Sequence, residues 1–166
     1  MKPPYRLTAN LEWTSKCNAR CSMCPRHVIE DSTIMSMDTW RTVIGRLNPA
    51  DLYRAIIAGY GEPTTHPQFE DFIDEIRDHP VHFDMVTNGS RLDRQRLLHM
   101  DGALGMLMVS FSSIDPDVYG KVHAKLKQQQ VMENICRAKE LFQQTQLSIS
   151  LTPMPECIDT LPATIE

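Results

Sequence analysis

Residues 52–76, LYRAIIAGYGEPTTHPQFEDFIDEI, contain one complete strand–loop–helix unit and show the pattern that the whole chain repeats. The apolar run at 52–58 is typical of a buried strand, and the stretch 59–67, with its glycines and prolines, is typical of a loop. Apolar residues at helical spacing then mark one face of a helix: Phe69, Phe72, Ile73 and Ile76. A buried strand followed by an amphipathic helix is the repeating unit of parallel α/β folds.

The same alternation extends in both directions from this unit. Further strands are expected at residues 7–14, 81–86, 106–111 and 147–151. Further helices are expected at residues 37–47, 92–100 and 131–143, with a short helical turn opening at Asp115-Pro116 and another helix opening near residue 158.

These elements predict an α/β fold, namely a partial, open (βα) barrel of the TIM-like type with parallel strands. A closed barrel of eight such units needs about 250 residues, and this chain has 166. We therefore expect a barrel that is truncated after about five strands. Residues 1–166 are expected to form one core domain that is incomplete at its C-terminus.

The composition is that of an ordinary globular domain, with 42% hydrophobic and 23% charged residues. A net charge of −4 and the lack of a dominant Lys/Arg run argue against a nucleic-acid partner. No apolar run approaches the roughly 20 residues needed to span a bilayer, and the N-terminus lacks the apolar stretch of a signal peptide. We expect a cytoplasmic protein with no membrane partner.

Three of the five cysteines are crowded into residues 17–24, CNARCSMC, with the spacing C-x3-C-x2-C. Such a set suits metal ligation in a reducing compartment better than a disulfide framework. The motif follows the first expected strand, and loops at the carboxyl ends of parallel strands build active sites. Three soft ligands suit an iron–sulfur cluster and leave one iron without a protein donor. A zinc site completed by His27 or by a distant cysteine is the alternative.

The cysteine motif resembles the signature of the radical SAM superfamily, in which an apolar residue, here Met23, precedes the last cysteine. The resemblance covers most of the chain. It implies that Cys17, Cys21 and Cys24 hold a [4Fe–4S] cluster. It also implies that Met23 lies near the adenine of bound S-adenosylmethionine.

Three further segments of the chain resemble motifs of this family. Gly61-Glu62-Pro63 resembles its Gly-Glu-Pro motif, which receives the amino group of the methionine moiety, although Tyr60 stands where a first glycine is usual. Thr87-Asn88-Gly89 resembles its Thr-Asn-Gly segment, and Ser110 matches a polar position that contacts the methionine carboxylate or the ribose. The expected cofactor-binding residues are therefore Met23, Gly61, Glu62, Pro63, Asn88 and Ser110.

The resemblance implies an enzyme that cleaves S-adenosylmethionine reductively to methionine and a 5′-deoxyadenosyl radical, which abstracts hydrogen from a substrate. It implies a one-electron reductant of the flavodoxin or ferredoxin type as a partner. The segment CNARCSMCPR, followed later by GEPTTHP, is most similar to the branch of the family that carries a Cys-rich SPASM-type tail. That tail is absent here. This similarity suggests a peptide or protein substrate. No side chain is assigned a catalytic role beyond binding the cofactors.

Two other classes of function stay open. Clustered thiols would also serve a noncatalytic iron–sulfur or zinc binding module, which would not cleave S-adenosylmethionine. The chain could also be an inactive fragment or a partner subunit, because an unpaired fifth strand leaves a sheet edge open. Cys136, Cys157 and the six histidines show no metal-ligand spacing and are not assigned to the site.

Overall fold

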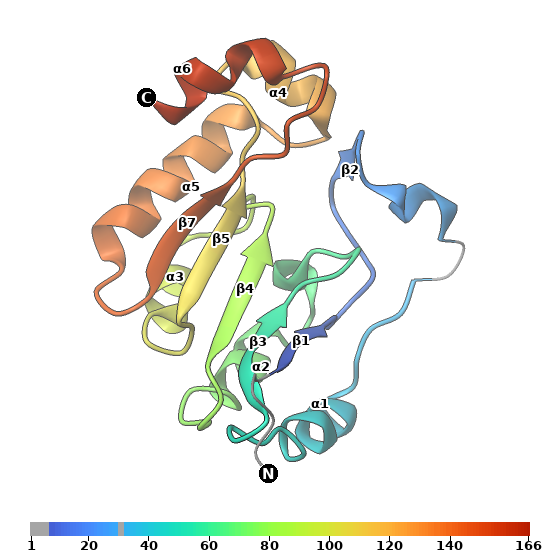
Figure 1. Cartoon of the computed structure of the whole chain (residues 1–166), viewed down its shortest axis with the longest axis vertical. Helices are drawn as coiled ribbons and strands as arrows, with labels where there is room; N and C mark the ends of the chain where they lie inside the picture. The colour runs from blue at the N-terminus through green and yellow to red at the C-terminus, as the bar shows by residue number, and fades with distance from the viewer. Residues whose placement is uncertain (1–6, 30–31) are drawn as a thin grey trace.

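A sheet of five parallel strands forms the centre of the protein (Figure 1). The computed structural model describes residues 7–29 and 32–166. The sheet has the order β1-β3-β4-β5-β7, and every neighbouring pair is parallel. Its strands are β1 (Leu7–Leu11), β3 (Leu52–Ile57), β4 (Phe83–Thr87), β5 (Met106–Ser110) and β7 (Gln146–Ser150).

The order of the strands decides between the two common parallel architectures. Each new strand of this sheet is added beside the previous one, always on the same side. A doubly wound sheet reverses its strand order, whereas a (βα) barrel does not. Within the described ranges β1 and β7 do not pair with each other, so the barrel is open. The predicted partial, open (βα) barrel of the TIM-like type, with five parallel strands, is confirmed.

Helices connect the strands as the periodicity predicts. The connecting helices are α1 (Met37–Ile44), α2 (Phe69–Asp74), α3 (Arg94–Met100) and α5 (Gln128–Leu141). The shorter elements are β2 (Arg20–Cys21), η1 (Pro25–Val28), η2 (Pro63–Thr65), α4 (Pro116–Val122), β6 (His123–Ala124), η3 (Ile158–Thr160) and α6 (Leu161–Ile165). Figure 1 shows β2, α4 and α6 beyond the carboxyl ends of the sheet strands. None of the described helices is long and apolar enough to span a membrane.

An aromatic cluster fastens the first two helices to the sheet. The rings of Trp40 and Phe72 stack with their centroids 5.5 Å apart, and Trp13 packs edge-on against both. All three side chains are buried, as are Phe69 and Ile73 of α2 and Ile76 just after it. Because burying one large apolar side chain is worth about 1.5–3 kcal/mol, this cluster holds α1 and α2 firmly in place.

Most element boundaries differ from the prediction by one to three residues, and two of the differences have a clear physical reason. β1 ends at Leu11 rather than at residue 14, because Trp13 and Ser15 instead exchange backbone hydrogen bonds with the chain around residues 33–35. α5 begins at Gln128 rather than at Val131, because its polar first turn has no apolar periodicity to reveal it.

A short antiparallel ladder that the sequence does not predict joins the cysteine loop to the segment after α4. In this ladder β2 pairs with β6, so that Cys21 lies opposite His123. These two residues are 102 positions apart in the chain. Two-residue strands carry no periodicity, which is why the sequence does not indicate them.

A single carboxylate secures the turn between α5 and β7 to the end of α3. Asp101 accepts hydrogen bonds from the backbone N–H groups of Gln143, Gln144 and Thr145, at 3.0, 3.0 and 2.9 Å. Partial burial opposes the ionisation of Asp101, but these hydrogen bonds outweigh it and lower the pKa of the carboxyl.

We expect Asp101→Asn to lower the free energy of unfolding at pH 7 by about 1–2 kcal/mol, because hydrogen bonds to a charged acceptor are stronger than those to a neutral one. A lowered pKa stabilises the fold above the unfolded-state value of about 3.9, and this contribution is lost as the pH falls through the folded-state pKa. Urea unfolding of the parent and the variant should therefore differ at pH 7 and converge towards pH 3. The exposed Asp78→Asn variant is the control, and an equal loss for both variants would contradict the prediction.

Candidate cofactor site

The three clustered cysteines converge in the loop that follows β1. Cys17, Cys21 and Cys24 are each half-buried and line one cavity of about 320 Å³. The backbone N–H of Cys24 donates to the carbonyl of Cys21 at 3.2 Å, and this turn brings the second and third thiols together. None of the five cysteines, all of which the structure describes, forms a disulfide. The predicted ligand set is therefore assembled on one wall.

The environment of this cavity opposes the ionisation of free thiols. Burial, and then the neighbouring Cys17, Cys24 and Glu62, raise the pKa of Cys21 to about 12, and burial also raises the pKa of Cys17. Thiolates are the ligand form, so metal binding at such thiols releases protons and relieves their mutual repulsion.

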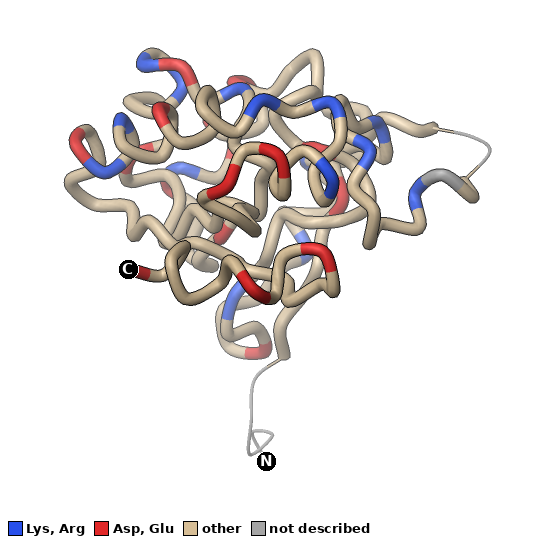
Figure 2. The backbone as a smooth tube through the Cα atoms, turned by 90° about the horizontal axis from the view of Figure 1, so that it is seen from above, with Lys and Arg blue, Asp and Glu red and all other residues tan. Residues whose placement is uncertain are grey.

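Basic side chains complete the wall of the same cavity. They are Arg20, Arg26 and Lys125. Figure 2 shows Lys/Arg and Asp/Glu positions interspersed over much of the described backbone. The cations beside the cysteines are therefore a local feature of this cavity.

The described residues form no ready-made site for a single metal ion. Among the side chains that the structure describes, no three His, Cys, Asp or Glu residues lie close enough together to hold one ion. A zinc site needs its ligands around one point, whereas a polynuclear cluster is held by thiolates that line a larger space. The three cysteines line a common cavity. The side chain of His27, the alternative zinc ligand, lies outside the described part of the chain.

A second cavity, of about 190 Å³, lies against the same three cysteines at the carboxyl ends of β3, β4 and β5. Five of the six predicted cofactor-binding residues line it: Met23, Gly61, Glu62, Asn88 and Ser110. Pro63 is buried at the start of η2 and is not among the lining residues. The predicted residues thus come from three separate loops and the end of β5, and they meet at the edge of the sheet.

Gly61 lets the loop after β3 approach the cysteine loop more closely than any side chain would allow. A Cβ atom on Gly61 would lie 1.8 Å from the carbonyl oxygen of Thr14. The carboxylate of Glu12 holds this loop from the other side by accepting from the backbone N–H groups of Tyr60 and Gly61. Tyr60, which replaces the usual glycine, has no left-handed backbone and is half-exposed, so the replacement brings no strain here.

Glu62 joins the loops that follow β3 and β4. Its Oε1 accepts from the hydroxyls of Thr64 and Thr87 at 2.6 and 2.7 Å, and its Oε2 accepts from the backbone N–H of Asn88 at 2.7 Å. The side chain is 3% exposed, and this burial raises the pKa of the carboxyl, against the effect of the hydrogen bonds. Each carboxylate oxygen has two acceptor positions, so Oε2 retains one for a ligand in the cavity.

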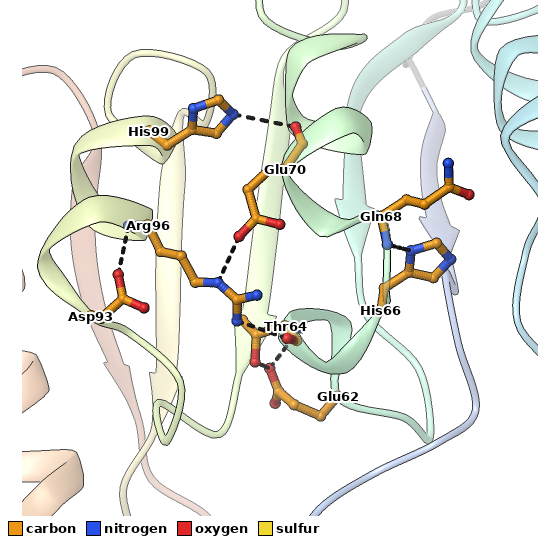
Figure 3. Close-up of polar contacts among 8 residues, drawn as sticks. All are labelled: Glu62, Thr64, His66, Gln68, Glu70, Asp93, Arg96 and His99. Carbon is orange, nitrogen blue, oxygen red and sulfur yellow. Dashed lines mark hydrogen bonds and ion pairs between the residues drawn. The ribbon is translucent and has the colours of Figure 1, made fainter.

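A second set of contacts holds the turn of Glu62 from outside (Figure 3). Arg96 of α3 donates from Nη1 to the carbonyl of Thr64 at 2.9 Å and from Nε to Glu70 at 2.8 Å. Asp93 caps the same helix by accepting from the backbone N–H of Arg96. The turn that presents Glu62 is therefore positioned by α3 as well as by the sheet.

Asn88 is tied to the cysteine loop by its side chain. Its Nδ2 donates to Oδ1 of Asn18 at 2.8 Å, while Nδ2 of Asn18 donates to Oγ of Ser90 at 2.8 Å. Ser90 closes the ring by donating from Oγ to Oδ1 of Asn88 at 2.7 Å. This arrangement couples the Thr-Asn-Gly segment to the first cysteine, a role that the motif alone does not reveal.

His123 is a residue of this site that the sequence analysis missed. It lines the second cavity, is 1% exposed, and places Nδ1 3.4 Å from Sγ of Cys21. Burial lowers the pKa of its ring to about 4, so the imidazole is neutral near pH 7. Only the β2–β6 ladder brings it to the cysteines, and no spacing rule would have found it.

The two remaining cysteines lie elsewhere, as expected. Cys136 is exposed on α5, and Cys157 is buried near the start of η3 with its thiol 3.4 Å from the carbonyl oxygen of Thr152. Neither lines the cavities at the cysteine motif.

Comparison with known proteins extends these observations. The sequence model of the Radical SAM superfamily matches residues 11–166. The chain is 33% identical over 104 residues to the tungsten-containing aldehyde ferredoxin oxidoreductase cofactor-modifying protein of Pyrococcus furiosus, covering 61% of this chain and 29% of that protein. It is 28% identical over 162 residues to the probable GTP 3′,8-cyclase of Methanococcus maripaludis, covering 94% of this chain and 53% of that protein. The chain thus spans about half the length, or less, of these curated relatives.

Solved structures share the fold at low sequence identity. The structure of anSMEcpe with bound AdoMet and Cp18Cys peptide aligns with a TM-score of 0.74 at 15% identity, covering 97% of this chain and 49% of that one. SuiB of Streptococcus suis aligns with a TM-score of 0.78 at 11% identity, covering 97% of this chain and 36% of that one.

Proposed function

The chain belongs to the radical SAM superfamily, and on this premise we propose that it is the core of an enzyme that holds a [4Fe–4S] cluster and S-adenosylmethionine side by side. One observation carries the proposal: Cys17, Cys21 and Cys24 form the wall shared by two adjacent cavities. Three thiolate ligands leave one iron open, and the second cavity gives a small molecule access to that side. An open coordination position is a feature of catalytic rather than structural metal sites.

When bound, this cofactor pair supplies one-electron reductive cleavage of a carbon–sulfur bond, which gives methionine and a 5′-deoxyadenosyl radical. The chain holds and orients the reactants. The free acceptor position of Glu62 would receive the amino group of the methionine moiety, and Gly61 lets the backbone approach it. Met23 would contact the adenine, with Asn88 and Ser110 at the polar edge of the cavity.

The basic residues that line the cavity of about 320 Å³ favour a protein reductant as a partner. Arg20, Arg26 and Lys125 lie beside the cysteines, and complementary charge speeds the encounter of two proteins. An acidic one-electron carrier of the flavodoxin or ferredoxin type is the partner whose charge would match this wall. A peptide or protein substrate stays a prediction, since the curated relatives include a GTP 3′,8-cyclase and the peptide-bound structures share only the fold.

Anaerobic reconstitution with iron and sulfide tests the proposal. We expect the reduced protein to give an electron paramagnetic resonance signal of a [4Fe–4S] cluster that changes when S-adenosylmethionine is added, because the cofactor would ligate the open iron. A cluster whose signal ignores S-adenosylmethionine would favour the noncatalytic binding module. Well-folded protein that takes up no cluster would overturn the proposal.

A further inference from the structure

We propose that His123 is a positioning residue that donates a hydrogen bond from Nδ1 to the Cys21 thiolate and thereby makes the bound cluster easier to reduce. This inference rests on the proposed function, because it concerns the cluster that Cys21 would ligate. It gives a defined role to a buried imidazole that family motifs and sequence spacing leave unassigned.

The position of the imidazole is fixed from three sides. Nδ1 lies 3.4 Å from Sγ of Cys21, and Nε2 lies 2.8 Å from Oγ of Ser112. The ring packs against Tyr119, with the two ring centroids 4.7 Å apart. The backbones of Cys21 and His123 are paired in the β2–β6 ladder, and Ser22 donates from its N–H to the carbonyl of Val122 at 2.9 Å. The contact is therefore held by backbone as well as by side chains.

The direction of the hydrogen bond follows from the chemistry of the two groups. A cysteine thiolate that ligates a metal has no proton and can only accept. The ring nitrogen that faces it must then carry the proton, which assigns the donor to Nδ1. In the neutral imidazole Nε2 is left as an acceptor, and the hydroxyl of Ser112 lies at the right distance to donate to it. The Ser112 hydroxyl can donate as well as accept, so its contact is compatible with the tautomer that Cys21 needs.

A hydrogen bond to a ligating sulfur changes the energy of adding an electron. The reduced cluster carries one more negative charge than the oxidised one, and an N–H aimed at sulfur stabilises that added charge. The effect is stronger in a site that excludes water, and His123 is 1% exposed. Loss of the donor should therefore shift the cluster to a more negative reduction potential.

Two amide variants separate the two nitrogens of the ring. In His123→Asn the amide nitrogen reaches the position of Nδ1, so it keeps a donor for Cys21 and loses the contact with Ser112. In His123→Gln the amide reaches the position of Nε2, so it keeps the contact with Ser112 and presents no N–H to Cys21. The two variants are similar in polarity, which makes each a control for the other.

The measurement is a redox titration of the cluster-loaded proteins followed by electron paramagnetic resonance. We expect the midpoint potential of His123→Gln to be more negative by about 59 mV. For a one-electron couple, this shift corresponds to about a tenfold lower ratio of reduced to oxidised cluster at a given potential. His123→Asn should stay close to the parent midpoint. Equal midpoints in all three proteins, or an equal shift in both variants, would overturn the role of Nδ1 as donor.

A second measurement needs no variant. In the parent protein with its oxidised cluster, the ring nitrogens of ¹⁵N-labelled histidine should show a proton on Nδ1 of His123 and none on Nε2. The opposite tautomer would overturn the inference even if the variants failed to load a cluster. Parent protein that holds no cluster would overturn the proposed function itself, so the two failures are distinguishable.

Discussion

Cys21→Ala is expected to abolish cluster assembly, and with it any cleavage of S-adenosylmethionine. Cys21 is the middle ligand of C-x3-C-x2-C, and its thiol lies in the wall shared by both cavities. Two remaining thiolates cannot hold a four-iron cluster that already lacks a fourth protein ligand. Iron and sulfide content after anaerobic reconstitution, together with 5′-deoxyadenosine formation under a chemical reductant, should fall to background.

The matched control for this variant is Cys136→Ala. Cys136 is exposed on α5 and lines neither cavity, so its removal should leave cluster content and cofactor cleavage at the parent level. Circular dichroism melts of both variants will show whether the fold is kept. A folded Cys21→Ala protein with a parent-like cluster that still responds to S-adenosylmethionine would show that Cys21 is not a ligand.

Gly61→Ala should cause the second large effect, on both stability and cofactor binding. The added Cβ would lie 1.8 Å from the carbonyl oxygen of Thr14 and 2.8 Å from that of Lys16, so two backbone segments would have to separate. Overpacking of this kind costs about 3 kcal/mol. The displaced loop also carries Glu62, so the affinity for S-adenosylmethionine should fall by about tenfold or more, equivalent to about 1.4 kcal/mol.

Gly120→Ala is the control for this substitution, and it should raise the free energy of unfolding rather than lower it. Gly120 lies within α4, and a Cβ there meets no atom within 4 Å. Alanine in a helix is favoured over glycine by about 0.5–1 kcal/mol, so this variant should be slightly more stable. Denaturant unfolding and calorimetric titration with S-adenosylmethionine measure both effects. Parent-like stability and affinity in Gly61→Ala would show that the two loops are not tightly packed against each other.

The regular elements of this fold were predictable because each is encoded by neighbouring residues. The apolar run at 52–58 and the helical spacing from Phe69 to Ile76 both appear in the structure, as β3 and as the buried face of α2. Two of the boundaries that differ from the prediction lie where this local signal fades. β1 ends early because the chain turns to pair with residues 33–35, and the polar first turn of α5 has no apolar face.

In the candidate site, too, contiguous motifs were predictable and contacts between distant residues were not. The cysteine spacing and the Gly-Glu-Pro and Thr-Asn-Gly segments are visible in the sequence because each is a short, contiguous pattern. The contacts that position them are not contiguous. Glu62 reaches Thr87 and Asn88 because β3 and β4 are adjacent and parallel, so that their carboxyl ends meet at one edge.

The contact between His123 and Cys21 is the feature that the sequence alone did not predict. Composition, periodicity and motif spacing were enough for the βα alternation, the parallel strands and the three thiols, since all of these depend on residues close together in the chain. The approach of His123 to Cys21 depends on a two-residue ladder between segments 102 positions apart. Such a ladder is stable only because packing over the whole core brings the two segments together. No local sequence pattern indicates it.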